Sequence, residues 1–255
     1  MNMKIRLHQF LSKCGIFTSK NEVKNAIWSG DVSVNGSTVK DIKFEFNPNT
    51  KPVTFKGKLL TLPTNDVYFL LNKPEGVICS RLNDQEKQLN KKSVYEIFRD
   101  KVPSNVYESL ITVGRLDEDT TGFLLVTTDG KLVDKITNPK NHISKKYLVE
   151  TELGITENEI SQIKRGVKIE ISDNDYYERY VSQPANITLD DEKIAVLTIK
   201  EGKKRQIRRM FSALGNYVIS IHRLAIGSME LSNYDINTGE FQEITLDEIN
   251  QYISK

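Results

Sequence analysis

The chain has 255 residues, of which 38% are hydrophobic and 27% are charged, as in folded globular proteins. It contains no apolar run near the roughly 20 residues that a membrane-spanning helix needs, and its first residues lack the apolar core of a secretory signal. We therefore expect a cytoplasmic protein that is long enough for two domains or one large one.

The cysteines and histidines do not form a recognisable ligand pattern. Cys14 and Cys79 stand far apart without a CxxC spacing, and the three histidines are scattered along the chain at positions 8, 142 and 222. Neither a disulfide framework nor a zinc site is indicated. We expect no metal and no cofactor.

Positive charge is concentrated at the N-terminal end of the chain. The total net charge is only +2, but residues 1–60 carry ten lysines and arginines against four acidic residues, which gives this segment a local charge of +6. Such asymmetry indicates a polyanionic partner, because basic side chains that neutralise phosphates release counterions on binding.

The same segment has the pattern of a compact module of two helices and a hairpin. Apolar residues at 7, 10, 11 and 14 share one helical face, with Gly15 as a stop, and Ser19–Glu22 has capping-box spacing for a second helix that ends at Gly30. Val32–Val34 alternates as a strand, and Asn35-Gly36 is a strong hairpin signal.

The segment RLHQFLSKCGIFTSKNEVKNAIWSGDVSVNGSTVK, residues 6–40, resembles the small alpha-L RNA-binding domain of the S-four type. The resemblance implies RNA contacts by basic residues on the helices, namely Arg6, Lys13, Lys20 and Lys24. Lys20 stands where an arginine is commoner, which keeps the charge but loses the planar fork for phosphate. The alternative is a solvated basic face.

The polar, proline-containing stretch 61–66 is a predicted linker, so the domains are expected at 1–60 and 67–255. The second domain shows short strands and helices without a regular βαβ rhythm, which favours an α+β fold with a mainly antiparallel mixed sheet and flanking helices. The stretch 80–92 is expected to be a loop. Helices are predicted from Ser93, around Leu132 and from Thr156, and strands at 67–71, 147–149, 167–171, 177–181 and 195–199.

The stretch VGRLDEDTTGFLLVTTDG, residues 113–130, places three acidic residues in a loop before a buried strand. Loops held by rigid strands often carry chemistry, although a solvated acidic turn is the alternative on pattern alone.

A second polar cluster lies at residues 201–210, before and within a helix whose buried positions would be Ile207, Met210, Phe211 and Leu214. Five basic residues gather at or near the positive N-terminal end of that helix: Lys203, Lys204, Arg205, Arg208 and Arg209. This arrangement is unfavourable unless an anion lies there, and RNA phosphates and a carboxylate are the candidates. A solvated basic face is the alternative.

Four segments together resemble the RsuA family of ribosomal RNA pseudouridine synthases. They are PEGVICS at 74–80, the stretch 113–130, ITNPKNHISKKYLVE at 136–150 and EGKKRQIRRMF at 201–211. Members of this family commonly carry an alpha-L domain in front, so the resemblance covers nearly the whole chain.

The resemblance implies that a uridine in RNA is flipped out of its stack and isomerised without a cofactor. Asp117 would be the catalytic aspartate, Tyr147 would lie against the uracil, and Arg208 would pair with Asp117. Arg115 would order the loop or contact the RNA, and Ile207 would line the pocket. Further substrate contacts are expected from Lys203, Lys204, Arg205 and Arg209.

The predicted partner is ribosomal RNA, with the small-subunit (16S) RNA favoured by residues 136–150, and the predicted state is a monomer. Alternatives are a large-subunit (23S) or transfer RNA enzyme of the same family, or a non-catalytic RNA-binding or ribosome-assembly protein. A glycosidic hydrolase would need Glu118 or Asp119 as a second carboxylate beside Asp117.

Overall fold

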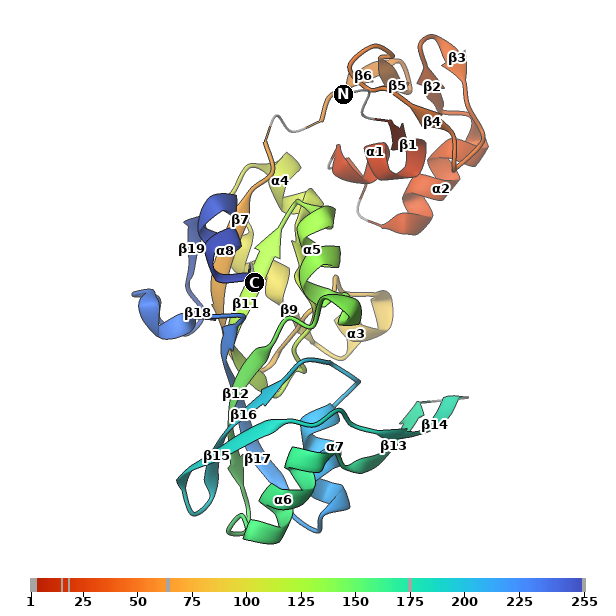
Figure 1. The fold of residues 1–255 in the computed structure, drawn as a ribbon. Helices are drawn as coiled ribbons and strands as arrows, with labels where there is room; N and C mark the ends of the chain where they lie inside the picture. The colour runs from red at the N-terminus through yellow and green to blue at the C-terminus, as the bar shows by residue number, and fades with distance from the viewer. Residues whose placement is uncertain (1–3, 15, 18, 63–64, 174–175, 254–255) are drawn as a thin grey trace. The chain divides into compact units, whose positions relative to one another are not determined.

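The structure is a computed structural model that describes residues 4–14, 16–17, 19–62, 65–173 and 176–253. It divides into two compact units (Figure 1). The first contains residues 1–67 together with 98–111 and 127–129, two segments that the sequence placed in the second domain. The second contains 68–97, 112–126 and 130–255.

The first unit begins with two helices and continues with short strands. Ser19 accepts a hydrogen bond from the backbone N–H of Glu22, and Gly30 ends the second helix in the left-handed conformation, as predicted. Asn35 and Gly36 both have positive φ, which closes the predicted hairpin. The elements are β1 (Ile5–Arg6), α1 (Leu7–Lys13), α2 (Lys20–Ser29), β2 (Val32–Val34), β3 (Ser37–Thr38), β4 (Glu45–Phe46), β5 (Val53–Phe55), β6 (Lys58–Leu60) and α4 (Ser104–Ser109).

The core of the first unit joins the apolar faces of α1 and α2 to the strands. Leu7, Leu11 and Ile27 are fully buried, and the ring of Phe10 meets that of Phe46 edge to face at 5.4 Å. The residues that the helical spacing predicted to be buried therefore belong to this core. Gly15, the predicted helix stop, lies outside the described residues.

A nine-stranded sheet is the framework of the second unit. Its central order is β15-β16-β12-β17-β11-β7-β19, with β10 beside β11 and β18 beside β17. β12 runs antiparallel to both of its neighbours, whereas β11 and β17 are parallel. The strands are β7 (Tyr68–Lys73), β10 (Ile111–Thr112), β11 (Thr120–Thr127), β12 (Lys145–Thr151), β15 (Asn186–Asp191), β16 (Ile194–Ile199), β17 (Val218–Ile226), β18 (Met229–Glu230) and β19 (Phe241–Ile244).

Helices and small hairpins accompany this sheet, which makes the fold α+β, as predicted. Figure 1 shows α6 and α7 beside the part of the sheet formed by β12, β15, β16 and β17. The elements of the second unit outside the large sheet, with η for a 3-10 helix, are β8 (Val77–Ile78), α3 (Asp84–Gln88), β9 (Lys92–Ser93), η1 (Val94–Phe98), α5 (Gly130–Thr137), η2 (Pro139–Asn141), α6 (Glu157–Arg165), β13 (Lys168–Asp173), β14 (Tyr176–Val181), α7 (Gln206–Ala213), η3 (Leu231–Asn233) and α8 (Leu246–Ile253).

The structure corrects two expectations. The predicted loop at 80–92 contains α3, whose Asn83 and Glu86 form a capping box. The strand predicted to stop at Leu71 continues through Lys73. This lysine is fully buried, and its ammonium group donates hydrogen bonds to backbone carbonyls. Both corrections concern polar residues whose partners are not apparent from hydrophobic periodicity.

Gly122 allows the parallel strands β11 and β17 to approach each other. Its φ is +97°, and a Cβ at this position would lie closer than 3.0 Å to the backbone oxygen and nitrogen of Arg223. Only glycine satisfies both conditions without strain.

We expect Gly122→Ala to lower the free energy of unfolding by about 2–4 kcal/mol, because the new methyl group must push two strand backbones apart. Gly130→Ala is the control, since Gly130 opens α5 with nothing within 4 Å and should change stability by less than about 0.5 kcal/mol. Urea denaturation of both variants checks this. Equal stability of the two would contradict the close approach.

Candidate active site

The loop before β11 carries three consecutive acidic residues, Asp117, Glu118 and Asp119, and the structure gives each carboxylate a different environment. The backbone N–H of Thr120 donates to the carbonyl of Asp117 at 3.1 Å, which makes the loop a tight turn into the strand. The contacts of the three side chains therefore decide which one faces a substrate.

The Lys73 side chain holds the backbone of this loop in place. Its ammonium group is fully buried and donates to the carbonyls of Thr120 at 2.8 Å, Pro74 at 3.0 Å and Glu118 at 3.4 Å. Burial lowers the pKa of Lys73, against the opposing effect of Cys79 and of the acidic residues of the loop. A buried ammonium with three carbonyl acceptors fixes the path of the loop.

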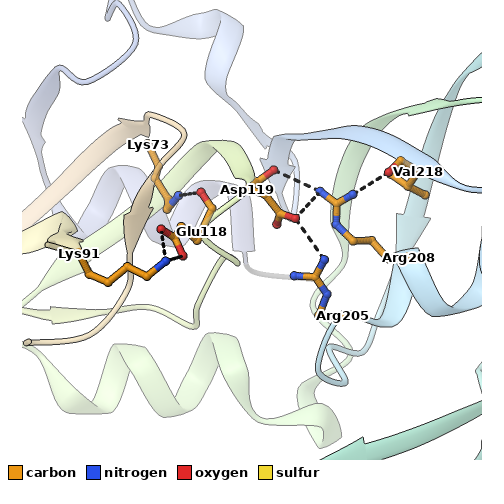
Figure 2. A network of polar contacts seen from close by, with 7 residues as sticks. All are labelled: Lys73, Lys91, Glu118, Asp119, Arg205, Arg208 and Val218. Carbon is orange, nitrogen blue, oxygen red and sulfur yellow. Dashed lines mark hydrogen bonds and ion pairs between the residues drawn. The ribbon is translucent and has the colours of Figure 1, made fainter. Parts of the chain in front are cut away.

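Glu118 is bound on both its side chain and its backbone. Its carboxylate accepts two hydrogen bonds from Lys91 at 2.7 and 2.8 Å, and its carbonyl also accepts the N–H of Gly76 at 2.9 Å. Figure 2 shows Lys73 and Lys91 approaching this residue from the same side. The Glu118 carboxylate thus has a cation of the protein as its partner.

Asp119 is held by two arginines of the second polar cluster. One carboxylate oxygen, Oδ2, lies 3.1 Å from Nη2 of Arg205 and 3.1 Å from Nη2 of Arg208. Arg208 also donates to the Asp119 carbonyl at 3.2 Å and to the carbonyl of Val218 at 2.8 Å, so it links the loop to β17 (Figure 2). The guanidinium of Arg208 therefore acts as a brace between the two segments.

This geometry corrects the predicted pair between Arg208 and Asp117. Arg208 binds the neighbouring Asp119, and the carboxylate of Asp117 makes no hydrogen bond or ion pair with the described part of the chain. Asp117 is partly exposed. Of the three adjacent carboxylates, the one that forms no hydrogen bond or ion pair with the described chain is the one that the sequence motif marked as catalytic.

The start of α7 is organised by a buried acidic residue. The Glu201 carboxylate accepts hydrogen bonds from Tyr180, from the side chain of Gln206 and from the N–H of Gln183, and the Gln206 side chain in turn accepts the N–H of Lys203. Arg205 follows in the left-handed conformation, with φ of 51°, as the N-cap of the helix. This network aims Arg205 and Arg208 at Asp119.

The carboxylates also supply counter-charges for the basic helix start. Arg205 and Arg208 bind Asp119, and Lys203 binds Glu178 at 3.1 Å and lies 4.5 Å from the centre of the Tyr180 ring. One of the two anions expected there, a carboxylate, is thus present in the protein. Of the other predicted contact residues, Lys204 and Arg115 are exposed, Arg209 is half-buried and Ile207 is buried.

Tyr147 lies in the middle of the sheet, on β12, and is only 8% exposed. It is opposite Leu197 of β16 and Arg223 of β17, so its side chain and that of Arg223 emerge on the same face. Thr120, which ends the acidic loop, pairs with Ile221 on the other edge of β17. Two strand spacings, about 10 Å, therefore separate the strands that carry the loop and Tyr147.

The N-terminal basic residues differ in their surroundings. The guanidinium of Arg6 pairs with Glu45 at 3.2 Å, and the ammonium of Lys13 lies 3.8 Å from Asp66. Lys24 is exposed on α2. The side chain of Lys20 lies outside what the structure describes.

Within the described residues no group of three or more histidine, cysteine, aspartate or glutamate side chains could hold a metal ion. None of the helices in the same ranges combines the length and the apolar character that crossing a bilayer requires.

Sequence reasoning missed Lys73 and Arg223, and it did not identify Asp119 as the partner of Arg208. Lys73 looked like part of a strand break, and Asp119 like a solvated neighbour of Asp117. A lysine directly after a buried apolar run was the available signal for Lys73. Arg223 lies in β17, a strand that the sequence analysis did not predict.

Comparison with known proteins finds relatives along the whole chain. Residues 67–213 match the family model described as RNA pseudouridylate synthase. An uncharacterized RNA pseudouridine synthase of Bacillus subtilis is 32% identical over 249 residues, covering 96% of this chain and 97% of the relative. The ribosomal small subunit pseudouridine synthase A of Escherichia coli is 32% identical over 245 residues, covering 96% of this chain and 98% of the relative.

A solved structure agrees with these sequence relatives. A crystal structure of a pseudouridylate synthase superimposes with a TM-score of 0.67 at 32% sequence identity, covering 98% of this chain and 99% of that one.

The different environments of Asp117 and Asp119 predict different effects of removing each charge. Asp119→Asn should lower the free energy of unfolding by about 1–2 kcal/mol, because the largely buried Arg208 loses its anionic partner. Asp117→Asn, which breaks no ion pair of the described chain, should change it by less than about 0.5 kcal/mol. Urea denaturation measures both, and equal losses would contradict the assignment of partners.

Proposed function

This chain belongs to the RNA pseudouridylate synthase family, and from that premise we propose that it converts a specific uridine of small-subunit ribosomal RNA to pseudouridine, with Asp117 as the catalytic carboxylate. The observation that carries the proposal is the environment of the acidic loop. Glu118 and Asp119 are bound by cations of the protein, and Asp117 is left to meet a substrate.

An ionised carboxylate suits both ways of starting this reaction. It can attack C1′ of the ribose as a nucleophile, or it can remove the 2′ proton as a base. In either case the bond between C1′ and N1 breaks, the uracil turns, and C5 forms the new bond to the ribose. A base inside a folded RNA must leave its stack to reach this loop.

The other predicted residues receive roles consistent with their positions. Tyr147 provides a rigid aromatic wall against the flipped uracil, because it is buried in the central strand β12. Arg208 positions the loop through Asp119. Arg115, Lys204 and Lys24 are exposed and suited to the RNA backbone. The resemblance of the N-terminal segment to an alpha-L domain adds Lys20 to these proposed contacts.

Small-subunit RNA is favoured as the substrate because relatives named ribosomal small subunit pseudouridine synthase A match this chain over nearly their whole length. This substrate implies that the protein acts in the cytoplasm, and we propose that it does so as a monomer.

The structure weighs against the two rival functions. A hydrolase acting through paired carboxylates needs a second available carboxylate, but the other two carboxylates of the loop, Glu118 and Asp119, are bound by cations. A non-catalytic RNA-binding protein would not need the Asp117 carboxylate to remain without an ion pair in a loop that the structure fixes at several points.

Removing the Asp117 charge tests the proposal. We expect Asp117→Asn to abolish pseudouridine formation while the affinity for RNA stays within about threefold, because the carboxylate acts in the chemistry and not in the grip on the RNA. Carbodiimide labelling and reverse-transcription stops on 16S RNA from cells with the wild-type protein, the variant or neither would show one site that depends on Asp117.

Glu118→Gln is the matched control, since it removes an adjacent charge that is bound to Lys91, and it should retain activity within about tenfold. Turnover by Asp117→Asn would overturn the assignment of the aspartate. A modified site in 23S or transfer RNA, with 16S RNA unchanged, would overturn only the choice of substrate.

A further inference from the structure

Arg223 is a buried cation that the roles above do not use. The residue is only 3% exposed, and its Nε donates to the carbonyl of Phe123 at 2.7 Å. Its Nη2 is shielded from solvent and has no hydrogen-bond partner among the described residues. An arginine stays charged in a protein, and a buried donor without an acceptor is costly, so this position calls for a ligand.

A second cation without a carboxylate lies on the same face. Lys145 precedes Tyr147 by two residues on β12, so the two side chains emerge together, and Tyr147 is directly opposite Arg223. Burial and the nearby charge of Arg223 lower the pKa of Lys145. The Lys145 ammonium makes no hydrogen bond or ion pair within the described ranges.

The neighbouring residues do not neutralise this pair. Cys79 interacts electrostatically with Arg223, but burial raises the pKa of its thiol, which is therefore neutral near pH 7. Several other cations of this unit have carboxylate partners, among them Lys91, Lys203 and Arg208. Lys146, the next residue along β12, extends from the opposite face and binds Glu230 at 2.6 Å. On this part of β12, the cation with a counter-charge therefore lies on one face, and the cation without a counter-charge in the described chain lies on the face that carries Tyr147.

On the basis of the proposed function, we infer that Lys145 and Arg223 form a cationic subsite beside Tyr147 that binds the uracil when it leaves the ribose as an anion. When the bond between C1′ and N1 breaks, its electron pair stays on N1 and spreads over O2 and O4. The ribose is compensated by the Asp117 carboxylate, either through a bond to C1′ or through loss of the 2′ proton. Both routes release the same uracil anion.

The subsite would act where negative charge develops. Donors that are fixed before the reaction and shielded from water stabilise such charge most strongly. The same cations can hold the base while C5 attacks C1′. As this bond forms, the Asp117 carboxylate leaves C1′ or returns the 2′ proton to C2′, so the negative charge passes back to Asp117. C5 then loses its proton and N1 gains one. A phosphate of the RNA is the less suitable ligand for Arg223, because the open Nη2 donor is buried beside a buried tyrosine.

The test compares single-turnover rates on one RNA containing uridine or 5-fluorouridine at the target position. Fluorine makes the uracil more acidic, so its anion is more stable and depends less on the cations of the subsite. We expect Lys145→Gln to slow glycosidic cleavage about 100-fold with uridine and only about tenfold with 5-fluorouridine, while the Kd for RNA stays within about threefold. Cleavage is followed as the loss of the starting nucleoside in nuclease digests.

Arg223→Lys, which keeps the charge, should recover part of the rate lost in Arg223→Gln, and circular dichroism shows whether each variant folds. Lys146→Gln is the matched control on the opposite face and should keep the wild-type rate. A rate for Lys145→Gln equal to that of Lys146→Gln would overturn the inference. So would an equal loss on both RNAs with weakened binding, which would identify a phosphate contact.

The wild-type protein separates this inference from the proposed function. Wild-type turnover combined with full activity of Lys145→Gln overturns the subsite alone. Absence of pseudouridine with the wild-type protein in every RNA tested overturns the proposed function, and the subsite with it.

Discussion

The buried ammonium group of Lys73 is the interaction on which the site depends. Its three acceptors belong to the backbone on either side, at Pro74, Glu118 and Thr120, so one side chain ties the end of β7 to the start of β11. A fully buried ammonium is tolerated only when its donors are satisfied. The carbonyls of the loop must therefore turn toward Lys73, and this constrains the directions in which the loop side chains can extend.

With the loop backbone fixed, nearby cations bind two of its three carboxylates. The pair between Lys91 and Glu118 is more than one third exposed on both sides and contributes little to stability. Its effect is to occupy Glu118. Arg208 is only 13% exposed and binds Asp119 on two oxygens, which gives a stronger and more directional contact. The result is a loop in which one carboxylate remains available and two are committed.

Local features of the fold could be predicted because their causes lie within a few residues. The Ser19 cap, the Asn35-Gly36 turn and the capping box at Thr156 depend on neighbouring side chains and backbone, and each is present. The family motif likewise located the acidic loop. The pairing of Arg208 with Asp119 could not be derived, because which of three adjacent carboxylates meets an arginine 89 residues later depends on the twist of the loop.

Lys145 and Arg223 escaped prediction for the same reason. The KKY that contains Lys145 belongs to a segment that carries the family resemblance, but the sequence pointed there to Tyr147 and not to the lysine. Only the register between β12 and β17 shows that Lys145 and Arg223 share one face. Among the residues of this region, Asp117, Lys145 and Arg223 form no ion pair with the part of the chain that the structure describes. Ion pairs between Asp117 and these two cations would stabilise the fold, but they would leave none of the three charged groups free to bind a substrate.

Charged groups that are partly or fully buried without an ion pair lower the stability of the fold. A reaction that develops opposite charges beside them can supply the missing electrostatic partners. Breaking the bond between ribose and base creates electron deficiency at C1′ and excess charge on the uracil. An unoccupied carboxylate suits the first and unoccupied cations suit the second. Because the sheet fixes Tyr147 and Arg223 and Lys73 fixes the loop, little of this arrangement needs to form during the reaction. On the proposed assignment of these residues, the strand framework contributes to catalysis by keeping the Asp117 carboxylate apart from Lys145 and Arg223.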